Sequence, residues 1–223
     1  MPLGPPPDKY TGQPASWVLP AGTPLWRVHH KSRSPAGFNE APAHKYFGGG
    51  RFDATADDNY PYLYAASADT TALAETLLRS LPFAPRHKRT LPRKSLSGRR
   101  LCRLETTTDL TFLSLLSSTD LAAVKQDDWL IYSEARDYAF TRHWAHWLRD
   151  QAAWAQGLVW RTRRDIGEFS AVLFGDRCPP GALQAAGRPG LVLDDAAGAR
   201  QLNEMLAAYD VRVYPPRTSG ARP

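Results

Sequence analysis

The segment Phe47–Leu78, FGGGRFDATADDNYPYLYAASADTTALAETLL, determines how we interpret the rest of this chain. It begins with the triplet Gly48–Gly50, and glycine permits positive φ angles and close approach of a ligand to the backbone. Arg51 follows the triplet directly, and a polar loop rich in aspartate then leads to the strand-like run Tyr62–Ala65. On its own the triplet indicates only a turn, so its meaning depends on the residues around it.

A helix is expected after this strand. Ser67 and Asp69 are residue types that cap helix N-termini, and the sequence that follows favours a helix over Thr70–Arg79. This helix carries Glu75, for which two interpretations remain open. In the first, Glu75 and Arg79 form a surface ion pair one turn apart, which stabilises a helix by only about 0.2–0.5 kcal/mol. In the second, Glu75 lies on a partly buried face, because its neighbours one turn away are mostly small or apolar.

The 223 residues suffice for one domain with terminal arms. We expect an irregular arm rich in proline and glycine over residues 1–22, of which 16–19 packs on the domain. The folded domain is expected over 23–214, and a disordered tail over 215–223. No run approaches the roughly 18 apolar residues of a membrane span, and the N-terminus lacks the basic-then-apolar order of a secretory signal. Two cysteines outside any metal or redox motif suit a cytoplasmic protein.

The chain is basic, with a formal charge of +6, and the excess gathers in one run. Residues 86–103, RHKRTLPRKSLSGRRLCR, contain no acidic side chain. The simplest interpretation is a solvated, mobile loop; the others are a docking surface for an acidic partner and, last, a nucleic-acid site. Nucleic acid is disfavoured because the run has no interleaved aromatic residues and no known nucleic-acid motif.

Short strands with helices inserted between them indicate an α+β fold rather than a regular βαβ alternation. The first strand of the body is expected at Leu25–His29, where alternation places Arg27 opposite Trp26 and Val28, on the solvent side. The remaining strands are expected at 101–107, 110–115, 157–160, 171–174 and 211–213, and further helices at 119–124 and 195–209.

The clearest helix is expected over residues 138–154. Phe140 and Trp144 recur at helical spacing and begin an apolar stripe. His143 and His146 lie three residues apart on the same helix, but nothing nearby supplies a convincing third ligand. We therefore expect no metal site.

The chain carries an ordered set of short motifs that extends over about Leu25–Arg177. No single motif is specific, but together they resemble the RES domain, a family named for an arginine, a glutamate and a serine. The position of the family's serine is assigned to Thr162, which keeps a hydroxyl and adds a methyl group. The motifs are Trp26-Arg27, Gly49-Gly50-Arg51-Phe52, Tyr64-Ala65-Ala66, Glu75 in ALAETL, the helix TRHWAHWLR, the strand and turn GLVWRTR, and Ala171-Val172-Leu173-Phe174-Gly175.

This resemblance implies the toxin half of a bacterial toxin–antitoxin pair, with an α+β fold similar to ADP-ribosyltransferases: a split β-sheet core with flanking helices. It implies that NAD+ is a substrate cleaved at the nicotinamide–ribose bond, with Arg51, Tyr64 and Glu75 as catalytic residues. Arg27 and Thr162 join these three in binding NAD+. A cognate antitoxin is the implied partner, a homo-oligomer is left open, and neither a membrane nor a metal is expected.

The roles that the resemblance implies agree with the chemistry of the side chains. A carboxylate such as that of Glu75 stabilises an oxocarbenium-like ribose. Tyr64 would hold the nicotinamide ring, and Arg51 or Arg27 would pair with the pyrophosphate. Because no Rossmann-type glycine fingerprint is present, NAD+ is expected to be consumed rather than used as a hydride carrier.

Three functions remain open at this point. The first is an NAD+-degrading enzyme that transfers ADP-ribose to water or phosphate. The second is an ADP-ribosyltransferase that modifies a protein. The third is a RES-like module that binds a nucleotide or a partner without turnover, and Thr162 in place of serine is the best support for it.

Overall fold

The computed structural model describes residues 4–79 and 81–214, so the tail expected to be disordered, 215–223, lies outside the described residues. The strands are β1 (Ser16–Leu19), β2 (Pro24–His30), β3 (Tyr62–Ala66), β4 (Arg89–Thr90), β5 (Arg99–Thr106), β6 (Leu110–Leu115), β7 (Gly157–Arg161), β8 (Phe169–Phe174), β9 (Leu183–Val192) and β10 (Val211–Arg212). The helices are α1 (Asp69–Leu73), α2 (Ser118–Ala123), α3 (Trp129–Tyr132), α4 (Tyr138–Gln151) and α5 (Ala196–Met205). A π-helical turn, η1 (Ala74–Leu78), continues α1, and three 3-10 turns are η2 (Arg93–Leu96), η3 (Ala135–Asp137) and η4 (Ala207–Tyr209).

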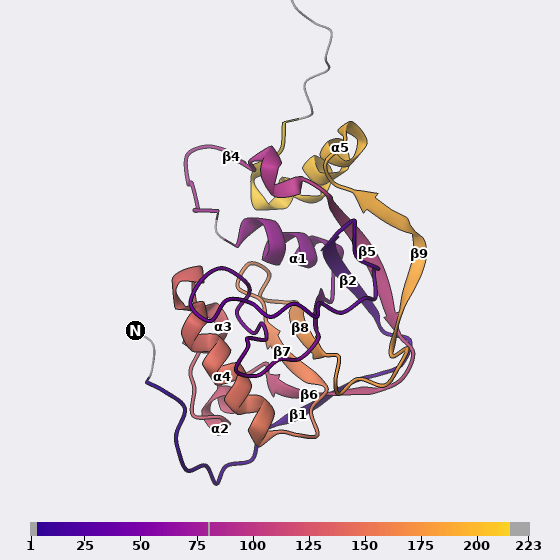
Figure 1. Ribbon diagram of the computed structural model, residues 1–223. Coiled ribbons are helices and arrows are strands. Elements are labelled where there is room, and N and C mark those ends of the chain that lie inside the picture. Colours follow the sequence, from indigo (N-terminus) through magenta and orange to yellow (C-terminus); the bar gives the residue numbers. More distant parts are fainter. Residues whose placement is uncertain (1–3, 80, 215–223) are drawn as a thin grey trace, which may run out of the picture.

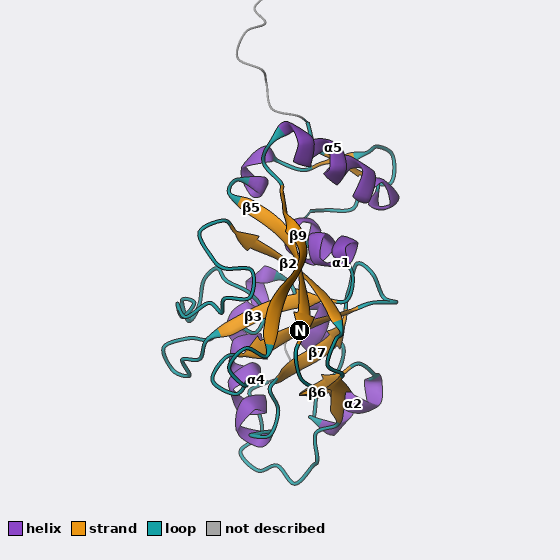
Figure 2. Cartoon of the chain, turned by 90° about the vertical axis from the view of Figure 1, so that its right-hand side faces the viewer, coloured by secondary structure: helices purple, strands orange, loops and turns teal. Residues whose placement is uncertain are grey.

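Eight strands form one mixed sheet in the order β1-β6-β7-β8-β3-β2-β5-β9. Strands β6 and β7 pair in parallel, and the other neighbours in this sheet pair antiparallel. The two halves of the sheet meet at β2 and β3, which share the single register pair Trp26 and Ala66. The sheet therefore splits at this junction, with β5 and β9 above it and β6 and β7 below it in Figure 2.

Three clusters of buried apolar side chains hold this architecture together. In the first, α2, α3 and α4 pack on β6, β7 and β8 through residues such as Leu121, Leu130 and Trp144. In the second, α1, η1 and α5 pack beside β5, and in the third the two sheet halves bury leucine side chains against each other. Figure 1 shows α3 and α4 beside the lower strands, with α1 next to β2 and α5 at the top.

Two segments expected to be irregular are ordered. Residues 16–19 of the N-terminal arm pack on the domain as expected, and they do so as strand β1, which pairs with β6 from Leu110 to Leu113. The basic run 86–103 is not a solvated loop, because it contains β4, η2 and the start of β5. Leu91 and Leu96 are buried in the second cluster, so apolar residues spaced among the basic ones anchor this segment to the body.

Two further features differ from the sequence pattern. Strand β9 is not predicted, because residues such as Gly187 and Pro189 are typical of turns; it is the outer neighbour of β5, and a sheet edge is where proline is tolerated. In α4, Trp144 is buried as expected but Phe140 is exposed. The helix starts at Tyr138, whose buried side chain takes the inward position of the first turn.

Candidate functional site

A cavity of about 500 Å³ opens at the junction of β2 and β3. Four of the five predicted site residues line it: Arg27 from β2, Arg51 from the glycine turn, Tyr64 from β3 and Glu75 from η1. The structure therefore brings these four together, from elements that are separate in the sequence. The aromatic part of the lining consists of Trp26, Tyr62, Tyr64 and Trp160.

Arg51 is a deeply enclosed charge of the site, with 5% of its surface exposed. Its Nε donates to Ser133 Oγ and its Nη2 to the Ser133 carbonyl, both at 3.3 Å. The guanidinium lies 5.8 Å from the ring centroid of Phe52 and 5.7 Å from that of Tyr138. Burial lowers the pKa of Arg51, and interactions with Tyr138 and Glu75 act in the opposite direction.

Ser133 is therefore a site residue that the sequence interpretation missed. It follows α3, and its hydroxyl reaches the arginine of the glycine turn from a position 82 residues later in the chain. Two serines accompany Arg51 and Glu75 in space, Ser133 in one cavity and Ser170 in another, whereas Thr162 was assigned that place from the sequence. A lone serine between two short helical turns carries no sequence signal that could have identified it.

Tyr64 has a hydroxyl with both hydrogen-bonding functions in use. It donates to Asp53 Oδ1 at 2.8 Å and accepts from the backbone N–H of Phe52 at 2.9 Å. Burial and the nearby Asp53 carboxylate raise the pKa of Tyr64 well above its ordinary value. The hydroxyl is therefore a structural link to the glycine turn, and the ring is the part of Tyr64 available to a ligand.

The same carboxylate fixes the glycine turn. Asp53 Oδ2 accepts from the backbone N–H of Gly50 at 2.7 Å. A Cβ at Gly50 would lie 2.5 Å from Asp53 Oδ1 and 2.9 Å from the Tyr64 hydroxyl, so this position has no room for a larger residue. Gly48 and Gly49 adopt positive φ angles of 60° and 71°, which explains the triplet. Asp53 also lines the cavity, and nothing in the sequence distinguishes it from the other aspartates of this loop.

Glu75 lies in the π-helical turn η1 and is half-buried. No ion pair joins Glu75 to Arg79, both of which the structure describes. The Arg79 guanidinium instead lies 4.9 Å from the ring centroid of Tyr138. Of the two interpretations of Glu75, the surface ion pair is therefore wrong and the partly buried face is confirmed. A π turn contains more residues than an α turn, so residues four apart are no longer aligned as an α-helix would align them.

Arg27 is buried, with 6% of its surface exposed, so the expectation that it faces solvent is wrong. Its Nη1 donates to the carbonyls of Pro35 and Gly37, each at 2.7 Å. These contacts tie the loop after β2 over that face of the strand, which alternation alone could not reveal. Burial and, secondarily, the positive charge of Arg33 lower the pKa of Arg27 to about 10.

Thr162 is not among the described residues that line the cavity. It is fully buried, and its hydroxyl donates to the Asp165 carbonyl at 2.6 Å. The Asp165 carboxylate accepts from the hydroxyls of Thr71, at 2.7 Å, and Tyr209, at 3.0 Å. Thr162 thus shapes the turn whose Asp165 contacts α1, the helix that leads to Glu75. Its hydroxyl is bonded within this turn and does not face the cavity.

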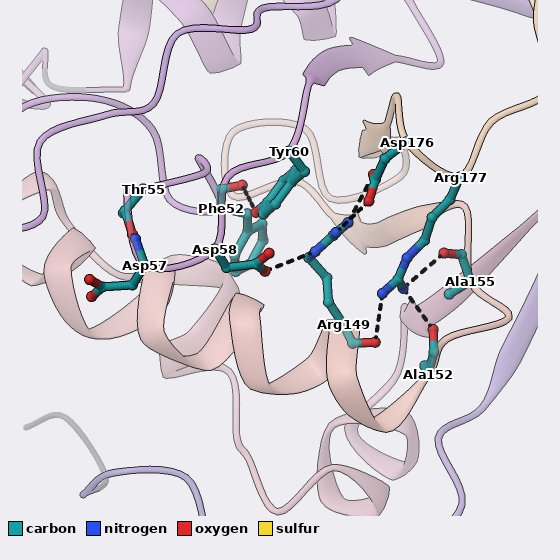
Figure 3. Close-up of polar contacts among 10 residues, drawn as sticks. All are labelled: Phe52, Thr55, Asp57, Asp58, Tyr60, Arg149, Ala152, Ala155, Asp176 and Arg177. Carbon is teal, nitrogen blue, oxygen red and sulfur yellow. Dashed lines mark hydrogen bonds and ion pairs between the residues drawn. The ribbon is translucent and has the colours of Figure 1, made fainter.

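The loop between the glycine turn and β3 is fixed from α4. Tyr60 donates to the carbonyl of Phe52 at 3.0 Å, and the Arg149 guanidinium lies 3.8 Å from the Tyr60 ring centroid. Arg149 pairs with Asp58 at 3.0 Å and with Asp176 at 2.7 Å, as Figure 3 shows. This network attaches the loop to α4 and to the end of β8, and so holds the backbone beside Arg51.

A second cavity of about 470 Å³ adjoins the first. Both cavities are lined by Arg51, Glu75 and Arg79, so these three side chains mark where the two meet. The second cavity is strongly cationic. Its remaining charged residues are Glu134, Arg136, Arg163 and Arg164.

The split sheet, the flanking helices and the cavity at the split together define an α+β fold of the ADP-ribosyltransferase-like type. A solved structure with this fold is the crystal structure of the MbcT–MbcA toxin–antitoxin complex of M. tuberculosis. It superimposes with a TM-score of 0.56 and 21% sequence identity over 78% of this chain and 87% of that chain.

The family follows from the sequence itself. The model of the RES domain matches residues 24–194, which is most of the chain. This chain therefore belongs to the RES domain family, as its motifs predicted. Comparison with curated proteins finds no match. Within the described residues, no helix is long and apolar enough to cross a membrane.

Proposed function

We propose that this chain is a RES toxin that cleaves the nicotinamide–ribose bond of NAD+ and passes ADP-ribose to water or phosphate. The observation that carries this proposal is the convergence of Arg51, Tyr64 and Glu75, from three different elements, on one cavity. Membership of the RES family supports it. Because the MbcT–MbcA structure is a toxin–antitoxin complex, we further propose a protein antitoxin as the partner of this chain.

The chemistry needs a group that stabilises positive charge rather than a general acid. When the C1′–N bond breaks, its electron pair goes to the nicotinamide nitrogen, and the base leaves neutral while the ribose becomes oxocarbenium-like. An oxygen of water or phosphate then attacks C1′, and water releases one proton. We assign the stabilisation of the ribose to Glu75, since a half-buried carboxylate interacts more strongly with such a charge than a fully solvated one.

The other residues take roles consistent with their contacts. The ring of Tyr64 would hold the nicotinamide, because its hydroxyl is already bonded to Asp53 and Phe52. Arg51 would offset the charge of the pyrophosphate, and its contacts to Ser133 keep the guanidinium in place. Arg27 contributes further positive charge to the same cavity.

The proposal is tested by following nicotinamide release from NAD+, with and without phosphate. Glu75→Gln removes the charge at nearly constant shape, and we expect it to slow release by about 100-fold or more, as for other electrostatic catalytic groups. Glu204→Gln is the matched control, because Glu204 is exposed on α5, away from the cavity. Full activity of Glu75→Gln would contradict the role assigned to Glu75.

The same assay distinguishes the other two functions. Labelled protein from tagged NAD+, in place of free ADP-ribose or its phosphate, would identify a protein ADP-ribosyltransferase. Nucleotide binding with neither product would identify a module without turnover. In cells, expression of the wild-type chain should arrest growth and Glu75→Gln should not.

A further inference from the structure

We propose that the dinucleotide lies across both cavities, with its nicotinamide end in the first and its ADP half in the second. This inference rests on the proposed function and adds to it a subsite for a nucleoside diphosphate. The residues that we assign to this subsite are Phe83, Arg163 and Arg164.

The position of Glu75 provides the first argument. A carboxylate that stabilises the ribose must lie beside the bond that breaks, and Glu75 is shared by the two cavities together with Arg51 and Arg79. The scissile bond therefore lies where the cavities meet. The two halves of the substrate must then extend in opposite directions, one into each cavity, and both cavities have volumes typical of ligand sites.

The linings decide which half goes where. The first cavity has aromatic walls from Trp26, Tyr64 and Trp160 and contains the buried Asp53 carboxylate. It also has four arginines in its lining, two of which, Arg27 and Arg99, are not in the described lining of the second cavity. Aromatic faces and a fixed negative charge suit a flat, positively charged nicotinamide ring. The Asp53 charge opposes a pyrophosphate, and the described lining of the second cavity contains no buried carboxylate.

The second cavity is the more basic of the two, with five arginines and two glutamates in its described lining against four arginines and two carboxylates in the first. Arg163 and Arg164 line it, in addition to the arginines at the junction. Arg164 Nε is buried without a hydrogen-bond partner in the described part of the chain. The pKa of Arg164 is lowered by burial and then by the nearby Arg163 and Arg89, which shows how closely positive charges gather here. A pyrophosphate would relieve this repulsion.

Phe83 supplies a surface for the adenine. Its ring lines the second cavity and is 72% exposed, so it is accessible to a ligand. Bases stack on exposed aromatic rings irrespective of their identity. The Arg89 guanidinium lies 5.6 Å from the ring centroid, so positive charge is also present beside this surface.

A third, smaller cavity is the competing place for the ADP half. It holds about 220 Å³ and is lined by Arg27, Arg33 and Arg99, with neither Glu75 nor Arg51 among its described lining residues. The third cavity adjoins the first, with which it shares Arg27, Tyr64 and Arg99, but it shares no described lining residue with the second. Arg33 also already donates to the side chain of Asn39.

Binding of ADP, measured by titration calorimetry on the full chain, tests the assignment. We expect Phe83→Ala and Arg163→Ala each to weaken ADP binding by about 5-fold or more, from lost stacking and a lost charge contact. Both side chains are exposed, so the variants should fold. Arg33→Ala tests the third cavity, and Arg200→Ala, an exposed residue of α5, controls for the loss of one positive charge; both should stay within about 2-fold.

The opposite pattern, in which Arg33→Ala weakens ADP binding while Phe83→Ala and Arg163→Ala do not, would overturn the subsite. So would a wild-type chain that binds no ADP at millimolar concentration. Nicotinamide release separates this result from the proposed function. If the wild type releases nicotinamide and the Phe83 and Arg163 variants keep its KM for NAD+, the subsite is wrong and cleavage stands. If ADP binding depends on these residues but no nicotinamide is released, cleavage is wrong and the subsite stands.

Discussion

The assignment of the Tyr64 ring, rather than its hydroxyl, leads to a specific prediction for Tyr64→Phe. This change removes one oxygen that donates to Asp53 at 2.8 Å and accepts from the N–H of Phe52 at 2.9 Å. Both partners are buried, so water cannot replace the lost hydroxyl easily. Leaving one buried N–H and one buried carboxylate oxygen without this partner should cost about 2–4 kcal/mol of the free energy of unfolding.

For a chain of this length, that loss corresponds to a fall in Tm of roughly 5–15 °C, measured by circular dichroism. The rate of nicotinamide release, measured well below the new Tm, should stay within about 10-fold of the wild-type rate, because the ring is retained. If the hydroxyl acted as a general acid, its removal would slow release by about 100-fold or more. Tyr64→Leu removes the ring and should reduce release much further. An unchanged Tm for Tyr64→Phe would contradict the structural role of the hydroxyl, and a loss of activity equal to that of Tyr64→Leu would contradict the role of the ring.

Three further predictions concern the surroundings of the site. Arg149→Met leaves Asp58 and Asp176 unpaired, and the side chains of these two residues are 31% and 41% exposed. The free energy of unfolding should therefore fall by about 2 kcal/mol, less than for a fully buried pair, and the midpoint of urea unfolding should fall with it. Burial lowers the pKa of His146. Below the pKa of about 6.5 of an unfolded histidine, the unfolded chain therefore binds a proton that the folded chain does not, and the free energy of unfolding should fall from pH 7 to pH 5.5. Thermal melts should show a less steep fall for His146→Gln. Thr162→Ser should leave nicotinamide release unchanged, because this hydroxyl serves a turn outside the cavity, and a large gain would show that the threonine limits the reaction.

Much of the fold could be predicted from the sequence because its signals are local. The helix that starts at Tyr138 and the strand Leu110–Leu115 lie where periodicity placed them. Strand β9 could not be predicted, since its glycines and proline are tolerated only because it is an edge strand paired with β5. Arg27 shows the same limit, because the loop that covers it is brought there by tertiary structure.

For the candidate site, the motif order identified Arg27, Arg51, Tyr64 and Glu75, and the structure places all four around one cavity. Ser133 and Phe83 were missed because each stands alone in an irregular segment and acquires its place only through folding. The π turn at Glu75 could not be predicted either, because an α-helix and a π turn have the same amino-acid composition. Only the three-dimensional structure shows that Glu75 faces the cavity and does not pair with Arg79.

The order of the strands also determines when during synthesis this protein can act. Tyr64 in β3 lies opposite Val172 in β8, so the wall of the cavity cannot form until the ribosome has added roughly a hundred residues after Tyr64. At about 5–20 residues per second, this takes on the order of 5–20 seconds. Throughout this interval the nascent chain carries its key arginine, tyrosine and glutamate but has no cavity to arrange them. Because β8 is synthesised late, Arg51, Tyr64 and Glu75 take up their arrangement around the cavity only after most of the chain has been made.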